Sequence, residues 1–296
     1  TISSNVIEIG DEAFCRFHGM IVWKDNPKVK VLGIKAFDSA SGINEFIIPS
    51  SVEEIKDNCF SGSTYEKISF EVGSKLKKIG NSAFGRTTIK SIVLPNMIME
   101  IGDYVFSDCK NLEDITIPKN VIIIKRAFSG CTALKNVYYK STIDDWLRLI
   151  YHSLMQRDSI YVNPMMYAEN LYVTNDDTTF TQPTSVIIPN DITTIKKGML
   201  LLKGVTSITV SDNVTAFDEE AFYGCNDLQE LTLPFIGLTL TDTTNDNYFL
   251  FGRLFSKKEA LGLTKVTQDD LSNEGSPLQY DFFIPTSLTK ITITSL

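Results

Sequence analysis

Residues 83–106 read AFGRTTIKSIVLPNMIMEIGDYVF, and they hold one complete unit of a repeat that runs through most of the chain. From Ile89 to Leu94, apolar and polar residues nearly alternate, which is typical of a short, half-buried strand. Pro95 ends that strand because proline cannot donate a ladder hydrogen bond. A second short apolar stretch and a Gly-Asp turn follow, and Phe106 closes the unit.

A large apolar residue, usually phenylalanine, recurs every 22–24 residues, and we call these residues anchors: Phe14, Phe37, Phe60, Phe84, Phe106 and Phe128, then Leu200 and Phe222. Five positions upstream of each anchor lies a further apolar residue: Ile9, Leu32, Ile55, Ile79, Ile101, Ile123, Ile195 and Phe217. A fixed period of this length is the signature of a solenoid, because one unit cannot bury its own apolar face. We therefore expect an α/β solenoid: a leucine-rich-repeat-like stack of coils about 4.8 Å apart, with short parallel strands.

The repeat register divides the chain into three parts that we expect to form one continuous domain. Residues 1–140 are N-terminal coils, residues 141–182 are an insert, and residues 183–296 are C-terminal coils and a cap. The insert predicts a helix over residues 142–156, followed by a strand at Asn170–Val173. The apolar face of that helix would consist of Trp146, Leu147, Leu149, Ile150 and Leu154.

The sequence after Pro234 departs most from the repeat. Two polar stretches, 241–247 and 267–276, are expected to be loops. A strand at Phe282–Pro285 and the run 288–294 would complete a last repeat coil. Such a terminal coil would shield the apolar end of the stack.

Net charge and apolar run lengths exclude several classes of partner. The formal net charge is −8 and the pI is about 4.9, whereas a nucleic-acid-binding protein needs a basic stripe. The same charge disfavours attraction to anionic membrane surfaces. No apolar run approaches the roughly 18 residues that a spanning helix needs, so we expect no membrane insertion of this fragment. Because the chain starts at Thr1 rather than at methionine, we interpret it as a mature or excised fragment.

The five cysteines follow the repeat. Cys109, Cys131 and Cys225 each lie three residues after an anchor, Cys59 precedes one, and Cys15 follows one. Free cysteine behaves as a small buried apolar residue. No C-x-x-C and no Cys/His ligand spacing is present. We therefore expect free core thiols. The alternatives are a disulfide and a reactive or metal-bound thiol.

Signals of chemistry are sparse. Neither of the two histidines, His18 and His152, belongs to a nucleophile or metal motif, and paired carboxylates such as Asp144-Asp145 are explained by solvated turns or a helix start. Residues 242–247 space Asp and Asn like a calcium loop but lack its glycine and distal glutamate. We expect no catalytic residue, no cofactor and no metal site, so the protein is not predicted to be an enzyme.

Two surface features remain as candidates for partner binding. Seven aromatic residues crowd into 35 positions: Tyr138, Tyr139, Trp146, Tyr151, Tyr161, Tyr167 and Tyr172. They either glue the insert helix to the coils or form an exposed platform, since Tyr and Trp dominate binding hot spots. The outward positions of the main strands are mostly small and uncharged: Ile47, Ser69, Val93, Thr116, Ile187, Thr209, Thr232 and Thr292. The predicted partner-binding residues are Tyr138, Trp146, Tyr151, Thr116 and Val93.

The repeat motifs resemble a known family. Ile-Gly-Asp-x-x-Phe at 101–106, Ala-Phe-Ser-Gly-Cys at 127–131, Ala-Phe-Tyr-Gly-Cys at 221–225 and Thr-Ile-Pro at 116–118 are similar to the BspA-like leucine-rich repeat proteins of bacterial surfaces. The resemblance implies a non-enzymatic, extracellular or cell-surface module that adheres to host or neighbouring-cell proteins. The alternative is a carbohydrate- or cell-wall-binding module of a larger surface protein.

Overall fold

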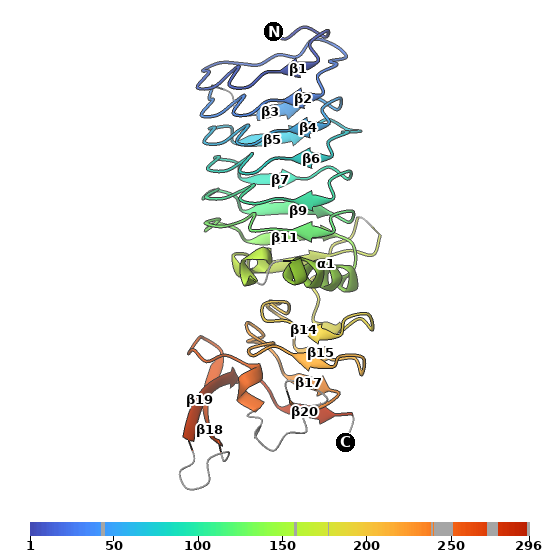
Figure 1. Cartoon of the computed structure of the whole chain (residues 1–296), viewed down its shortest axis with the longest axis vertical. Coiled ribbons are helices and arrows are strands. Elements are labelled where there is room, and N and C mark those ends of the chain that lie inside the picture. Colours follow the sequence, from blue (N-terminus) through green and yellow to red (C-terminus); the bar gives the residue numbers. More distant parts are fainter. Residues whose placement is uncertain are drawn as a thin grey trace. The chain divides into compact units, whose positions relative to one another are not determined.

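The computed structural model of the chain describes residues 1–42, 45–156, 159–176, 178–237, 239, 251–270 and 278–294. The chain divides into two compact units, one made of Thr1–Thr142 and Tyr161–Phe180, the other of Ile143–Ile160 and Thr181–Leu296. Each unit contains coils stacked through short parallel strands (Figure 1). The predicted repeat solenoid is therefore confirmed, while the expectation of one continuous domain stays a prediction.

Coils of the first unit place their strands in two sets of parallel ladders. The two-residue strands before the anchors are β1 (Glu8–Ile9), β2 (Val31–Leu32), β4 (Glu54–Ile55), β6 (Lys78–Ile79), β8 (Glu100–Ile101) and β10 (Ile123–Ile124). The longer strands are β3 (Glu45–Ile48), β5 (Lys67–Phe70), β7 (Ser91–Val93), β9 (Asp114–Pro118), β11 (Asn136–Lys140) and β12 (Asn170–Val173). The last four pair in the order β12-β11-β9-β7, and we call this sheet the long-strand ladder.

The anchors form the core of the first unit, as predicted. Their rings are fully buried from Phe37 to Phe128, and Phe14 in the first coil is half-buried. Centroids of successive rings are 5.1–5.6 Å apart with planes within 16° of parallel. Most anchor amides also donate to the carbonyl that precedes the next anchor, as Phe60 does to Ala83 at 2.7 Å. Ring stacking and backbone hydrogen bonds thus fix the same register.

One predicted position is off by one residue. Ile124, not Ile123, is the fully buried residue of β10, and it pairs with Ile101 of β8. The segment Val121–Ile124 is an unbroken apolar run, so alternation could not distinguish the two positions. The turn from Ile124 to Phe128 is one residue shorter than the same turn in the other coils, and this moves the inward position.

The cysteines are free, as predicted, and four of the five are buried. The Sγ atoms of Cys109, Cys131 and Cys225 donate to the carbonyl of the preceding anchor, 25 residues earlier, at 3.0, 3.0 and 3.1 Å. Desolvation raises the pKa of the Cys225 thiol to about 12. These thiols are therefore neutral hydrogen-bond donors inside the core, with little thiolate character.

The insert has the predicted helix and strand. The helix α1 (Ile143–Gln156) buries all five residues of its predicted apolar face: Trp146, Leu147, Leu149, Ile150 and Leu154. Two short 3₁₀ helices, η1 (Ile160–Val162) and η2 (Pro164–Met166), precede β12, which pairs in parallel with β11. No helix in the described part of the chain is both long and apolar enough to cross a membrane.

The second unit repeats the coil pattern with fewer strands. One parallel sheet joins β13 (Ser185–Ile187), β15 (Ser207–Thr209), β17 (Glu230–Leu233) and β20 (Lys290–Ile293), and a second joins β14 (Thr194–Ile195) and β16 (Ala216–Phe217). The predicted last repeat strand is thus confirmed at β20. Phe282–Pro285 is a strand, as predicted, but it is part of β19 (Leu278–Pro285), and its assignment to a repeat coil is corrected. That strand pairs antiparallel with β18 (Leu263–Asp270) in a hairpin outside the coil pattern.

The structure contains one further anchor, Phe255, that the sequence period did not predict. Phe255 is buried, and its ring lies 5.7 Å from that of Phe222. The amide of Phe222 donates to Leu254, the residue before Phe255, which repeats the hydrogen bond made between earlier anchors. The short helix η3 (Phe251–Leu254) supplies this turn. The coil pattern therefore continues past Phe222, after a spacing of 33 rather than 22 residues.

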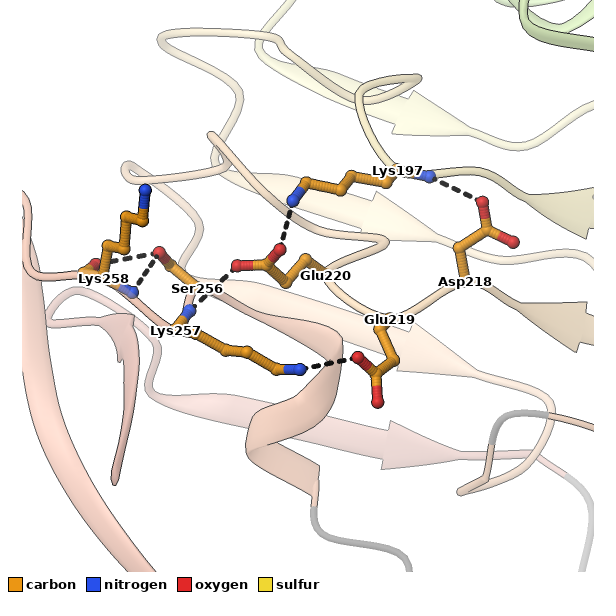
Figure 2. Close-up of polar contacts among 7 residues, drawn as sticks. All are labelled: Lys197, Asp218, Glu219, Glu220, Ser256, Lys257 and Lys258. Atoms are coloured by element: carbon orange, nitrogen blue, oxygen red, sulfur yellow. Dashed lines mark hydrogen bonds and ion pairs between the residues drawn. The ribbon is translucent and has the colours of Figure 1, made fainter. Parts of the chain in front are cut away.

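A cluster of charges fastens this last turn to the coil before it (Figure 2). Glu220 accepts hydrogen bonds from the Lys197 ammonium and from the Lys257 amide, and the Lys257 ammonium pairs with Glu219 at 2.6 Å. Desolvation raises the pKa of Glu220, but the hydrogen bond from Lys197 and its other cationic contacts outweigh it and lower the pKa overall. Glu220 is therefore ionised at neutral pH and holds two segments together.

Candidate functional site

The outward side chains of the long-strand ladder form a straight row, as the alternation predicts. Val93, Thr116, Tyr138 and Tyr172 are aligned across β7, β9, β11 and β12. Val93 is 56% exposed and the other three are half-buried, whereas their strand neighbours point into the core. We call this row the outer row. It brings together three of the five predicted partner-binding residues, Val93, Thr116 and Tyr138.

Tyr138 lies in a cluster of three rings on this face. Its ring stacks on Tyr172 with centroids 5.0 Å apart and planes 13° from parallel, and Phe180 meets it edge-on at 5.4 Å. We call Tyr138, Tyr172 and Phe180 the aromatic trio. Desolvation raises the pKa of the Tyr138 hydroxyl, and the nearby Asp114 charge adds to the shift. The hydroxyl is therefore neutral at physiological pH and can donate a hydrogen bond to a ligand.

A second row, of polar side chains, runs beside the outer row. Asn136 donates from Nδ2 to Oδ1 of Asp114 at 2.7 Å, and Asn170 donates from Nδ2 to Oδ1 of Asn136 at 2.9 Å. These three residues occupy one register position on β9, β11 and β12. The hydrogen bonds restrict their rotamers, so the surface beside the aromatic trio is ordered and polar.

An open hollow of about 420 Å³ lies over β5 and β7 on the same unit, and we call it the β5–β7 hollow. Val93 of the outer row lines it, together with Ser69, Ser91 and the turn residue Val72. Lys140 of β11 lines it as well, although β9 lies between β11 and β7. The Lys140 side chain therefore reaches across β9, where Thr116 and Pro118 are short.

Two predicted partner-binding residues lie elsewhere. Trp146 has an exposed fraction of 0%, so its assignment as a contact residue is corrected. It is on the inward face of α1, because the apolar stripe of an amphipathic helix turns to the core. Tyr151 is half-buried and its ring lies 5.9 Å from that of His152. Both residues belong to the second unit, whereas the aromatic trio belongs to the first.

Several adjacent carboxylates of the sequence are used in ion pairs within the chain. Asp145 pairs with Arg148 at 3.4 Å, and Arg148 also pairs with Asp191 at 2.9 Å. Glu53 and Glu54 pair with lysines of neighbouring coils. No group of three metal-ligating side chains occurs among the described residues. The calcium-like stretch 242–247 lies outside the described residues, so that expectation stays untested.

A hollow of about 430 Å³ lies on the second unit, over β13, β15 and β17. Ile187, Thr209 and Thr232 line it in register, as Val93 and Thr116 align in the first unit. Asn190 and Ser211 hydrogen-bond to each other at 2.7 Å on its rim. The outward row of the second unit, Ile187, Thr209, Thr232 and Thr292, contains no aromatic side chain, so the aromatic trio distinguishes the first unit.

Sequence reasoning missed Phe180 and the hollows. Phe180 follows a polar stretch of the sequence, and nothing in its own position indicates that its ring meets Tyr138. Hollows depend on which outward residues are short in adjacent coils. The register of the coils had to be known before either could be located.

Comparison with solved structures gives weak likenesses. A leucine-rich repeat protein from Bacteroides ovatus is 20% identical, with a TM-score of 0.48 over 77% of this chain and 61% of that one. The pneumococcal vaccine antigen PcpA is 16% identical, with a TM-score of 0.37 over 69% and 67%. A leucine-rich cell surface protein from Faecalibacterium prausnitzii is 20% identical, with a TM-score of 0.33 over 76% and 64%. No curated protein matches the sequence.

The sequence model of one family covers most of the chain. It describes a BspA type leucine rich repeat region and matches in six copies, at residues 1–109, 30–154 and 176–249. These matches include all the anchors found from the sequence and stop before Phe255. The chain thus belongs to the BspA-type leucine-rich repeat family, and the resemblance seen in its motifs is confirmed.

Proposed function

We propose that this chain is a non-enzymatic binding module of the bacterial surface or of a secreted protein, and that it holds a protein partner against the outer row of its first unit. The observation that supports this most is the aromatic trio beside small, uncharged side chains. A few residues carry most of the binding energy at protein interfaces, Tyr is enriched among them, and the contacts around them exclude water.

The geometry of the outer row suits a broad, shallow contact. Val93, Thr116, Tyr138 and Tyr172 follow one another at strand spacing, about 4.8 Å per step. Tyr138 and Tyr172 support each other by stacking, so little rotamer freedom remains to be lost on binding. A partner would bury the trio at one end of its contact and the small residues at the other.

Carbohydrate or cell-wall binding is the second candidate, and the polar row favours it. Asp114, Asn136 and Asn170 present ordered amide and carboxylate groups next to the aromatic trio. Aromatic faces combined with such fixed polar groups can orient a small polar ligand. The protein reading is preferred because the outer row beyond Tyr138 is apolar or carries only a hydroxyl.

Adhesion of beads coated with the chain to bacterial and epithelial cells distinguishes the two candidates. Target cells are treated with protease, with periodate, or with neither. The proposal predicts adhesion that protease abolishes and periodate leaves intact. Adhesion lost only after periodate would contradict the protein-binding proposal and support the carbohydrate alternative.

A further inference from the structure

Two apolar side chains are exposed to solvent in the β5–β7 hollow. Val72 is fully exposed at the turn after β5, and Val93 is 56% exposed on β7. Both line the hollow, and so do two hydroxyl-bearing strand residues, Ser69 of β5 and Ser91 of β7. Covering these valines would remove apolar surface from water, which is favourable.

Three charged residues line the same hollow, and two of them are engaged within the chain. Lys67 pairs with Glu45 at 2.8 Å, and Glu71 accepts a hydrogen bond from the Ser50 amide at 2.8 Å. Lys140 also lines the hollow, and its ammonium has no ion-pair partner among the described residues. The hollow therefore offers an apolar floor, the Lys140 ammonium and the Glu71 carboxylate, and that carboxylate is held by a backbone amide.

We propose that this hollow receives an acidic segment of the protein partner, in which an apolar side chain covers Val72 and Val93 and a neighbouring carboxylate meets Lys140. This inference rests on the proposed function and adds the chemistry of the segment that is recognised. The carboxylate is placed at Lys140 because that ammonium has no ion-pair partner among the described residues. Lys67 is paired with Glu45, and the Glu71 carboxylate is already held by the Ser50 amide.

Lys140 also restricts where an acidic partner can bind. The chain carries a formal net charge of −8, so its surface as a whole repels acidic segments. Lys140 is on the same outward face of β11 as Tyr138, two residues away. A segment placed in the hollow can therefore continue toward the aromatic trio. The hollow would select the segment, and the trio would add contact area.

The test uses the whole chain with ¹³C-labelled valine methyl groups, titrated with synthetic peptides and followed by NMR. The first peptide is acetyl-Gly-Asp-Phe-Asp-Gly-amide. The other two replace both Asp residues by Lys, or the Phe by Gly. We expect the first to shift the methyl signals of Val72 and Val93 and to bind at least about five-fold more tightly than either of the others.

One variant and its control test whether the acidic peptide binds next to Lys140. Lys140→Gln should weaken binding of the first peptide about three-fold at low salt, and the loss should shrink as salt rises. The control is Lys28→Gln, which changes an exposed lysine that does not line the hollow and should leave binding unchanged. Equal binding of the Lys peptide, or equal affinity in Lys140→Gln and wild type, would overturn the proposal.

Galacturonic acid tests whether the hollow binds the carboxylate of an acidic sugar rather than that of a protein segment. Shifts of the Val72 and Val93 signals by this sugar, without binding of the acidic peptide, would also overturn the proposal. Bead adhesion separates this failure from failure of the proposed function. If protease-sensitive adhesion persists while the acidic peptide does not bind, only the assignment of the hollow is wrong. If adhesion is not protease-sensitive, the proposed function itself is wrong.

Discussion

The first unit and the end of the second unit build the same coil by different means. In the first unit, anchor rings repeat every 22–24 residues and stack within 16° of parallel. At the end of the second unit, Phe255 follows Phe222 after 33 residues, and their planes are 30° apart. The hydrogen bond from the amide of one anchor to the carbonyl of the residue before the next anchor is nevertheless kept, here from Phe222 to Leu254. A coil can therefore persist after its sequence period is lost.

The two regions also differ in the polar contacts that connect neighbouring coils in addition to the anchor rings. In the first unit, buried thiols donate to the carbonyls of preceding anchors, as at Cys109 and Cys131, and ion pairs such as Lys78–Glu54 join the surfaces of neighbouring coils. The last turn relies on the ionic contacts of Glu220 and Glu219 with Lys197 and Lys257. The ion pairs of the first unit are largely exposed, so each contributes little to stability. An aperiodic turn is held by charged groups whose strength depends on pH and salt.

The largest expected effect tests whether Phe255 is equivalent to the anchors of the first unit. Phe106→Ala and Phe255→Ala should each reduce the free energy of unfolding by about 3–5 kcal/mol, because each opens a cavity in a close-packed core. Urea denaturation monitored by circular dichroism measures both, with the exposed Val72→Ala as the control. A Phe255→Ala variant as stable as this control would show that the last turn is not a coil.

The next effect concerns binding and contrasts the two units. Tyr138→Ala should weaken partner binding by about 2 kcal/mol, since an interface tyrosine of the first unit would be lost. Tyr280→Ala, which removes a tyrosine 38% exposed on the second unit, should leave affinity unchanged. Quantitative adhesion of coated beads measures both, after thermal melting has shown that each variant is folded. Equal loss in the two variants would break the distinction between the units.

Glu220→Gln tests the charged support of the last turn. The side chain is only 13% exposed, and its loss of charge should lower the free energy of unfolding by about 1–2 kcal/mol at pH 7. The folded-state pKa of Glu220 is depressed, so its contribution is fully present above its ordinary pKa and is lost as pH falls through the folded pKa.

The difference between wild type and Glu220→Gln should therefore be constant from pH 6 to 8 and shrink below about pH 4. Urea denaturation at each pH gives the difference directly. Glu219→Gln is the matched control, because its pair with Lys257 is exposed and should contribute less than about 1 kcal/mol. A pH-independent difference would mean that Glu220 acts through packing rather than charge.

The smallest effect is expected at the insert helix. Asp144→Asn removes a charge from the first turn of α1, which belongs to the second unit. Partner affinity should change by less than about 0.5 kcal/mol, because exposed charges contribute weakly. A several-fold loss of affinity in the bead assay would extend the binding surface to the second unit.

The sequence was sufficient to place buried residues and strands wherever the spacing of apolar residues followed a regular coil, helix or strand pattern. Anchors from Phe37 to Phe128, the inward face of α1 and the strand Asn170–Val173 follow from spacing and alternation alone. The apolar run at Val121–Ile124 carried no alternation, so the buried residue was misplaced by one. Phe282–Pro285 has the composition of a repeat strand, and only its antiparallel pairing with β18 distinguishes it from one.

The candidate site could be predicted only in part. Alternation along β11 indicates that Tyr138 points outward, and the register then aligns it with Thr116 and Val93. The grouping of Tyr138 with Phe180 depends on how the chain returns after β12, which no local pattern encodes. Trp146 lies on the helix face that the apolar spacing predicts to be buried. Its assignment as a contact residue rested on aromatic composition alone and was wrong.

Hydroxyl-radical footprinting of the chain bound to target cells tests the proposed binding surface most directly. Mass spectrometry then compares oxidation of each aromatic residue in the free and bound states. Tyr138, Tyr172 and Phe180 should become protected on binding, whereas Tyr104 and Tyr280, exposed at 42% and 38%, should be oxidised as in the free chain. Unchanged oxidation of the aromatic trio, with protection elsewhere, would contradict the assignment of the outer row as the binding surface.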